Sequence, residues 1–222
     1  MRSRNAPKTQ ARAKAGAEAG VKKEKPLGAG HGSFDLIDSE VLFKDLRLKK
    51  DGSLLDIACG KGAYTLAAYE FVGPRGALFA VDLWDEAIAA LKKEARARAI
   101  KNLTAKIADV GKKIPFADSS VGAALLATVL HDLVEEGKAT TALRETARVL
   151  KHGGLLAVVE FKKIDAPTGP PRRVRLNPLE VAALVAPFGF KRAKFRDLGP
   201  DIYLLVFGRV ASRLAHRAAD SP

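Results

Sequence analysis

The sequence predicts an α/β fold, a doubly wound and mostly parallel sheet of seven strands that ends in an antiparallel hairpin. Short apolar runs alternate with segments of helical periodicity along residues 54–161, as in parallel strands joined by crossover helices. The first apolar run leads into a turn that is rich in glycine. The last two expected strands, 192–198 and 202–209, lie too close together for a crossover helix, so they should pair antiparallel.

The ends of several expected elements carry specific signals. Asp38 and Asp85 can each cap the N-terminus of a helix with their side chains. Asn177 precedes a proline and is followed three residues later by a glutamate, the pattern of a capped helix start. The run His152-Gly153-Gly154 should stop the helix before the fifth strand. Strands are expected at 54–57, 77–81, 103–107, 121–128, 155–161, 192–198 and 202–209, and helices at 38–46, 64–71, 85–99, 129–134, 140–150 and 178–187.

Charge divides the chain of 222 residues into a basic tail, a folded domain and a second basic tail. Of the formal net charge of +13, residues 1–30 carry +6 and residues 209–222 carry +2, which leaves +5 for the rest. Residues 1–30 are nearly free of large apolar side chains and should be disordered. We therefore expect one domain at 31–209 and a basic C-terminal tail at 210–222. Because the folded part is only mildly basic, a nucleic-acid substrate is not required.

Several classes of protein are disfavoured by what the sequence lacks. No apolar run reaches the ~18 residues of a membrane span, and the N-terminus has no apolar signal core, so we expect a cytoplasmic protein. Cys59 is the single cysteine, which excludes an intrachain disulfide, and the four histidines are scattered, so no metal site is expected. The N-terminal tail has three interpretations: a solvated tail, an organelle transit peptide, or a weak polyanion-binding arm.

The turn at residues 54–65, LLDIACGKGAYT, carries the most specific signal in the chain. Gly60 and Gly62 lack a Cβ, so a ligand can approach the backbone closely, and the following helix points free N–H groups at the turn. These features predict a nucleotide-type site. A dinucleotide-binding turn would have a third glycine at the position of Thr65 and no acid at the position of Asp56. The alternative without a ligand is a tight strand-to-helix turn.

The pattern Asp-x-Ala-x-Gly-x-Gly at residues 56–62 resembles the first motif of class I S-adenosylmethionine-dependent methyltransferases. That family usually has glycine where this chain has Ala58. The resemblance covers residues 33–208 and is closest to the ubiquinone/menaquinone-type and general small-molecule branch. It implies a Rossmann-like sheet with the terminal hairpin, and S-adenosyl-L-methionine as the cofactor.

Acidic residues follow the second and third expected strands, where ligands of open α/β sheets bind. Asp82 can accept hydrogen bonds from both hydroxyls of a ribose, or it can start the turn into the next helix. Leu83 or Trp84 can cover the adenine, with simple packing as the alternative for Trp84. The resemblance implies that Asp109 takes the adenine amino group and that the N–H of Val110 meets the ring, with a turn-forming role as the alternative for Asp109. The predicted cofactor-binding residues are Asp56, Ala58, Gly60, Gly62, Asp82, Leu83, Asp109, Val110 and Thr128.

The residues after the fourth and fifth strands are candidates for the acceptor side. In the family that the sequence resembles, the segment at 127–132 lies beneath the sulfonium, which makes His131 the candidate catalytic base or acceptor-orienting group. The alternative for His131 is a local hydrogen bond at the start of a helix. Glu160 and Lys162 are further candidates. The Pro/Gly-rich segment 164–177 resembles a lid whose three arginines can meet an anionic acceptor, and the alternative is a solvated loop.

Methyl transfer asks the protein to align acceptor, methyl group and sulfur and to exclude water, so it needs no catalytic triad or metal cluster. The function that the resemblance implies is transfer of a methyl group from S-adenosyl-L-methionine to a small-molecule acceptor by in-line displacement. Two alternatives stay open. One is a methyltransferase that acts on RNA or protein, and the other is a non-catalytic cofactor-binding protein that its basic tails tether to nucleic acid.

Overall fold

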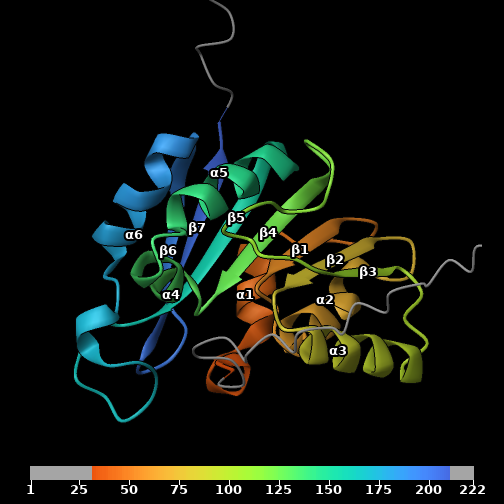
Figure 1. Ribbon diagram of the computed structural model, residues 1–222, viewed down its shortest axis with the longest axis horizontal. Helices are drawn as coiled ribbons and strands as arrows, with labels where there is room; N and C mark the ends of the chain where they lie inside the picture. The colour runs from red at the N-terminus through yellow and green to blue at the C-terminus, as the bar shows by residue number, and fades with distance from the viewer. Residues whose placement is uncertain (1–31, 211–222) are drawn as a thin grey trace, which may run out of the picture.

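The computed structural model describes residues 32–210, which form a seven-stranded sheet with helices on both faces (Figure 1). The two tails expected from composition lie outside the described residues, apart from Val210. The strand order across the sheet is β3-β2-β1-β4-β5-β7-β6. The strands are β1 (Ser53–Ile57), β2 (Ala77–Asp82), β3 (Leu103–Ile107), β4 (Val121–Ala127), β5 (Leu150–Phe161), β6 (Phe190–Asp197) and β7 (Ile202–Arg209).

The first five strands run parallel to one another, and β7 pairs antiparallel with both β5 and β6. The doubly wound, mostly parallel sheet with a C-terminal antiparallel hairpin is thereby confirmed. Because parallel strands point the same way, the carboxyl ends of β1 to β5 meet at one edge of the sheet. This edge is where an open α/β sheet binds its ligands.

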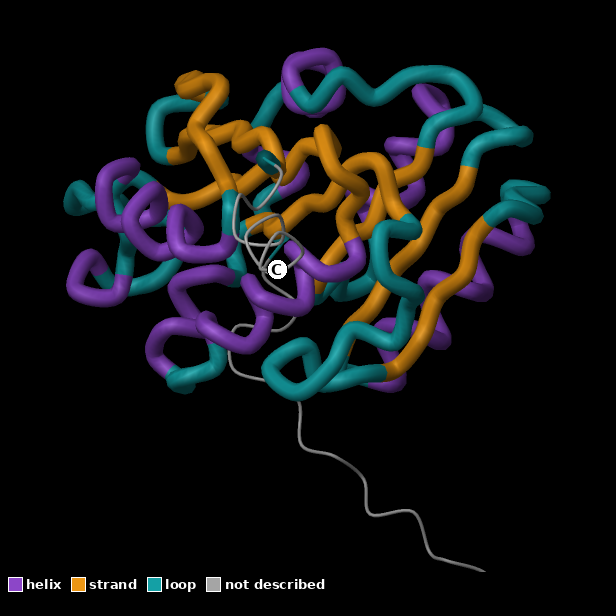
Figure 2. The backbone as a smooth tube through the Cα atoms, turned by 90° about the horizontal axis from the view of Figure 1, so that it is seen from above, coloured by secondary structure: helices purple, strands orange, loops and turns teal. Residues whose placement is uncertain are grey.

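Three helices cover each face of the sheet, and the view in Figure 2 shows helices on both sides of the strands. Helices α1, α2 and α3 pack on one face, and α4, α5 and α6 pack on the other. The helices are α1 (Ser39–Asp45), α2 (Ala63–Val72), α3 (Asp85–Ala97), α4 (Leu130–Glu135), α5 (Ala139–Val149) and α6 (Pro178–Val185), with short 3-10 turns at Phe34–Leu36, Arg172–Val174 and Ala186–Phe188. Within residues 32–210, no helix has both the length and the apolar character that crossing a membrane requires.

The central strands are buried on both faces because both are covered by helices. In β5, Val158 points into the core beneath α4, α5 and α6, whereas Val159 points into the core beneath α1, α2 and α3. Both side chains are fully buried. This arrangement explains why the strands appear in the sequence as near-continuous apolar runs rather than as alternating ones.

Two expected helix caps are present. The Asp38 carboxylate accepts the backbone N–H groups of Glu40 and Val41, at 2.9 and 3.2 Å, and so caps α1. Asn177 caps α6 in a full capping box, in which Glu180 accepts the backbone N–H of Asn177 in return. Caps of this kind typically stabilise a helix by about 1 kcal/mol each.

Two of the signals expected at element ends are wrong. Asp85 is the first residue of α3 and not its cap, because Trp84 has the extended backbone of a cap residue and donates its N–H to Asp82. Strand β5 begins at Leu150, so residues 152–154 lie within the strand and not in a helix-stopping turn. The glycine at 153 has a φ of +74°, which allows the backbone to bulge there before regular pairing with β4 resumes.

Candidate active site

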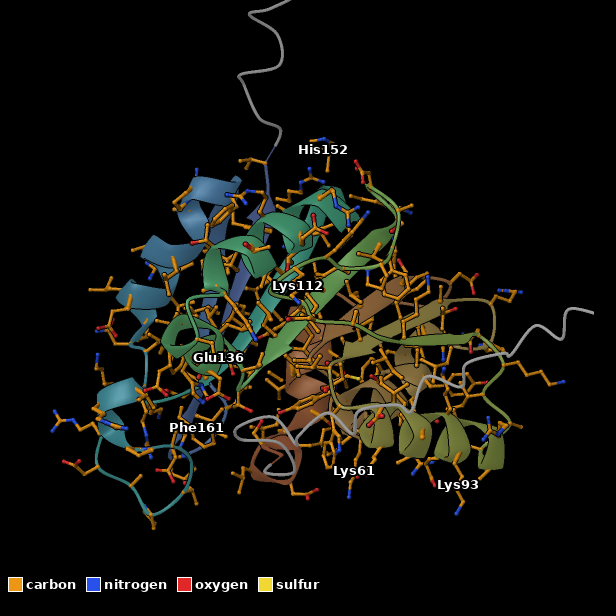
Figure 3. All side chains as sticks on the ribbon, in the orientation of Figure 1. Lys61, Lys93, Lys112, Glu136, His152 and Phe161 are labelled. Carbon is orange, nitrogen blue, oxygen red and sulfur yellow. The ribbon has the colours of Figure 1, made fainter. Side chains whose placement is uncertain are left out.

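A cavity of about 300 Å³ lies at the carboxyl ends of β1, β2, β3 and β4. The structure brings all nine predicted cofactor-binding residues to its wall, from four different strand ends. Figure 3 labels two charged residues that also line it, Lys61 from the turn after β1 and Glu136 from the end of α4. The parallel sheet therefore gathers into one cavity predicted residues that are up to 72 positions apart in the chain, from Asp56 to Thr128.

The glycine turn meets two different demands. A Cβ on Gly62 would lie 2.4 Å from Cδ1 of Leu91, and the φ of Gly62 is +78°, so glycine is needed there both for packing and for backbone conformation. Gly60 has a φ of +53°, and a Cβ built on it meets nothing within 4 Å. Its backbone is therefore open to a ligand. Ala58 also has a positive φ, +56°, a conformation that costs a residue with a side chain roughly 1–2 kcal/mol relative to glycine.

Asp56 lies at the bottom of the cavity and is 1% exposed. Its Oδ2 accepts a hydrogen bond of 2.6 Å from the hydroxyl of Thr65, at the first turn of α2. Burial raises the pKa of Asp56 to about 7; the Thr65 hydrogen bond opposes this shift, and the nearby charge of Asp82 adds to it. Thr65, which occupies the position of the absent third glycine, is thus the partner of the acid that begins the motif.

Asp82 joins the glycine turn to the end of β2. Its Oδ2 accepts the backbone N–H of Gly60 at 2.7 Å, and its Oδ1 accepts that of Trp84 at 2.8 Å. The side chain thus supports both turns. Because an ionised carboxylate has about four acceptor sites, these two bonds leave capacity for ligand hydroxyls.

Asp109 lies at the far end of the cavity, beside two residues that the sequence did not single out. Its Oδ1 accepts the backbone N–H of Gly111 at 2.9 Å, and its Oδ2 is 3.9 Å from the ammonium of Lys138. Lys138 is also 2.7 Å from Glu136, and both line the cavity. Lys138 and Glu136 belong to no sequence motif. They could be assigned to the cavity only from their position after α4, and that position is known only once the fold is known.

Three hydroxyl groups form a connected wall of the cavity. The Ser33 hydroxyl, 1% exposed, is 2.8 Å from that of Tyr64 and 3.1 Å from that of Thr128. The ring of Phe34 packs edge-on against Tyr64 with centroids 5.1 Å apart. The segment before α1 is thereby attached to α2 and to the end of β4. Sequence reasoning predicted Thr128 but missed Ser33 and Tyr64, because residues this far apart in the chain share no local pattern.

The predicted acceptor-side residues do not line the cavity. His131 is 4% exposed, and its Nδ1 is 2.7 Å from Oε2 of the fully buried Glu160. Lys162 pairs with Asp197 at 2.9 Å. In the segment 127–132, Asp132, the neighbour of His131, lines the cavity with an ionisable side chain.

The arginines of the segment 164–177 have separate environments. Arg175 is 2% exposed and donates to the carbonyl oxygens of Lys162, Thr168 and Pro170. Its guanidinium lies 5.5 Å from the ring centroid of Phe161, which Figure 3 labels. Arg175 therefore holds the loop together and is not available to an anionic acceptor, in contrast to the expectation for the basic cluster. The exposed Arg172 pairs with Asp165 at 3.3 Å.

The chemistry of the cavity fits an adenosine with a cationic substituent better than it fits a dinucleotide. Asp56 and Asp82 lie next to the glycine turn, where a pyrophosphate would have to sit, and like charges at such short range repel. The same carboxylates can accept ribose hydroxyls and attract an ammonium or a sulfonium. The open backbone at Gly60 allows close approach of such a ligand.

Comparisons with known proteins agree with this geometry. A family model described as "Methyltransferase domain" matches residues 55–158, which run from β1 to β5 and include the nine predicted residues. The ubiquinone/menaquinone biosynthesis C-methyltransferase of Pasteurella multocida is 28% identical over 116 residues, which are 52% of this chain and 42% of that protein. A demethylmenaquinone methyltransferase of Staphylococcus aureus is 29% identical over 126 residues, which are 57% of this chain and 50% of that protein. The chain thus spans about half the length of these curated relatives.

Solved structures share the fold over most of its length. A SAM-dependent methyltransferase of Aquifex aeolicus has a TM-score of 0.73 and 25% identity, covering 80% of this chain and 93% of that one. The geranyl diphosphate C-methyltransferase of Streptomyces coelicolor A3(2), solved with S-adenosyl-L-homocysteine, has a TM-score of 0.65 and 16% identity, with 78% of each chain covered. A [4+2]-cyclase has a TM-score of 0.66 and 18% identity, with 78% and 80% covered. Likeness at these two lower identities is likeness of fold alone.

Proposed function

We propose that this chain is a class I S-adenosylmethionine-dependent methyltransferase and that it transfers a methyl group to a small-molecule acceptor by in-line displacement. The observation that carries the proposal is that Asp56, Asp82 and Asp109 line the same cavity as the glycine turn. The cofactor is S-adenosylmethionine, which supplies a methyl group already activated by its sulfonium. The protein therefore has to bind, orient and exclude water, and it does not have to activate the donor.

In this proposal the residues at the different strand ends bind different parts of the cofactor. Asp82 accepts the ribose hydroxyls with the acceptor sites that its two backbone bonds leave over. Asp109 and Val110 hold the adenine, and Gly60 lets the ligand approach the backbone. The hydroxyl wall of Ser33, Tyr64 and Thr128 encloses the reacting end. The carboxylates also favour the cationic donor over a neutral ligand of the same shape.

For the acceptor we propose a quinol ring, methylated at carbon. Support comes from the curated relatives, whose names place them in ubiquinone and menaquinone biosynthesis. The cavity is enclosed by α4 and by the segment before α1, and its mixed apolar and acidic lining suits a planar ring with hydroxyl groups.

The test combines binding and transfer in the full chain. Isothermal titration should show binding of S-adenosyl-L-homocysteine but not of NAD. With labelled S-adenosylmethionine, mass spectrometry should then find the methyl group on a short-chain demethylmenaquinol. Absence of S-adenosyl-L-homocysteine binding at millimolar ligand contradicts the proposal as a whole. Binding without transfer to the quinol contradicts only the acceptor, and label appearing in added RNA or protein favours the macromolecular alternative.

A further inference from the structure

Three ionisable side chains form a connected row beside the cavity, at the ends of β4 and β5. Glu160 Oε2 lies 2.7 Å from Nδ1 of His131, and Nε2 of His131 lies 3.5 Å from Oδ1 of Asp132. The side chains of Glu160, His131 and Asp132 are 0%, 4% and 19% exposed. Of the three, Asp132 lines the cavity. The row therefore leads from the protein interior to the cavity wall.

Glu160 determines how the ring of His131 is turned. One carboxylate oxygen accepts the backbone N–H of His131 at 3.2 Å, and the other faces Nδ1. An ionised carboxylate can only accept hydrogen bonds, so Nδ1 carries a proton and Nε2 is left to face Asp132. The ring of Phe161 lies edge-on to the imidazole with centroids 6.4 Å apart. Nδ1 of His131 thus faces Glu160, and Nε2 faces Asp132.

Ionisable groups from three elements lie near the imidazole. Glu160 comes from β5, Asp132 and the exposed Glu135 come from α4, and Tyr203 of β7 is the residue paired with Glu160. Burial would lower the pKa of His131, but the hydrogen bond and charge of Glu160, with the charges on α4, outweigh it and raise that pKa. Burial raises the pKa of Asp132 as well, and the cation of His131 opposes that rise.

We propose that Asp132 is the base that takes the acceptor's proton, and that His131 and Glu160 are positioning residues that hold the Asp132 carboxylate toward the cavity. This inference rests on the proposed function. It differs from the sequence-based assignment, which placed the base at His131, because the cavity is lined by the neighbouring carboxylate.

The proton and electron balance is complete without a further reactant. Asp132 takes the hydroxyl proton of the quinol, and the electron pair of that O–H bond moves into the ring. The ring carbon forms its bond to the transferred methyl group, and the pair that had bonded the methyl group stays on sulfur. The C–H proton at that carbon then passes to solvent water, which restores the aromatic ring as a phenolate, and Asp132 returns its proton to the phenolate oxygen. General-base assistance of this kind typically contributes about 10²–10⁴ in rate.

The row itself is tested without any acceptor. In protein with ¹⁵N-labelled histidine, the His131 signals are identified by their loss in His131→Asn and titrated by NMR. Removing either carboxylate, in Asp132→Asn or Glu160→Gln, should lower the pKa of His131 by about one unit or more. Glu135→Gln, which removes an exposed carboxylate from the same helix, is the control and should shift it by only a few tenths. An unchanged pKa in both test variants overturns the proposal.

The role of the row is tested by kinetics on the demethylmenaquinol. Asp132→Asn should lower kcat about a hundredfold and leave the affinity for S-adenosyl-L-homocysteine within twofold. The rate of the wild type should rise with pH as Asp132 loses its proton. His131→Asn keeps a donor for Glu160 and removes the cation next to Asp132, so the rise should move to higher pH. Glu160→Gln also makes the imidazole lose its proton more easily, but it removes a negative charge that raises the pKa of Asp132, so its rise should move less than that of His131→Asn.

A purely structural role for the row predicts something else. The variants would then lose stability, and their activity would fall equally at every pH. The pH at which the rate rises would be the same as in the wild type, and the proposal would be wrong. Full activity of Asp132→Asn would also overturn it. A wild type that binds S-adenosyl-L-homocysteine but does not methylate the quinol refutes the acceptor of the proposed function, and the NMR titration still decides whether the row exists.

Discussion

The proposed donor side and the proposed acceptor side of the cavity are built in different ways. On the donor side, the predicted residues lie at or just after the carboxyl ends of β1, β2 and β3 and line the cavity. On the acceptor side, the predicted His131, Glu160 and Lys162 are engaged with other protein groups, and α4 supplies the residues that line the cavity. A strand end delivers its next residue to the ligand edge whatever its neighbours are. A residue on a helix or a loop faces the ligand only if its packing turns it that way.

The largest expected effect tests the rigidity of the donor side. Gly62→Ala should lower the free energy of unfolding by about 3–4 kcal/mol, because the new Cβ meets Leu91 and the backbone has a positive φ. Gly60→Ala is the matched control, with a positive φ but open space around the Cβ, and it should cost only about 1 kcal/mol. Urea unfolding followed by circular dichroism measures both. If both variants lost the same free energy of unfolding, backbone strain alone, and not packing against Leu91, would explain the need for glycine in the turn.

The next effect tests whether the acceptor-side loop is structural. Arg175→Met should lower the free energy of unfolding by about 2–3 kcal/mol, because three loop carbonyl groups lose their donor. Arg173→Met, at an exposed position two residues away, should change it by less than about 0.5 kcal/mol. The measurement is again urea unfolding. If the two variants were equally stable and Arg175→Met raised KM instead, this arginine would belong to the acceptor site.

A smaller effect tests the donor-side carboxylates. Asp82→Asn keeps an acceptor for one backbone N–H but loses the charge, so it should weaken S-adenosyl-L-homocysteine binding by about 2 kcal/mol. Asp85→Asn removes a charge three residues away that does not line the cavity, and it should bind as the wild type does. Isothermal titration gives both affinities. An unchanged affinity in Asp82→Asn would remove this residue from the donor site.

The smallest effect concerns the one irregular residue of the motif. Ala58→Gly removes the strain that the positive φ causes in a residue with a side chain. It also adds conformational freedom to the unfolded chain, so the net gain in the free energy of unfolding should be about 0.5–1 kcal/mol. Thermal unfolding should show a melting temperature a few degrees higher. A loss of stability would mean that the methyl group of Ala58 makes contacts in the cavity wall that outweigh the strain.

The strand order, the hairpin and the nine residues at the cavity wall were predictable from local patterns and from the rules of parallel sheets. Asp56, Asp82 and Asp109 follow from that reasoning, since each is placed by its strand. Ser33 and Tyr64 were not predictable, because their hydroxyl groups meet only after distant segments pack together. The sequence favoured His131 over Asp132, because the order of two adjacent residues does not reveal which one faces the cavity. The burial of Arg175 likewise depends on a loop conformation that carries no periodic signal.

The outer strand β6 has a consequence for how the protein behaves at high concentration. It leaves one side of its backbone unpaired at the edge of the sheet, and an unpaired edge can add strands from other molecules. Four of its eight residues are basic, at positions 191, 192, 194 and 196. Two copies that met edge to edge would bring these charges together and repel each other. Aggregation through this strand should therefore be suppressed in dilute salt and should increase when added salt screens the charges.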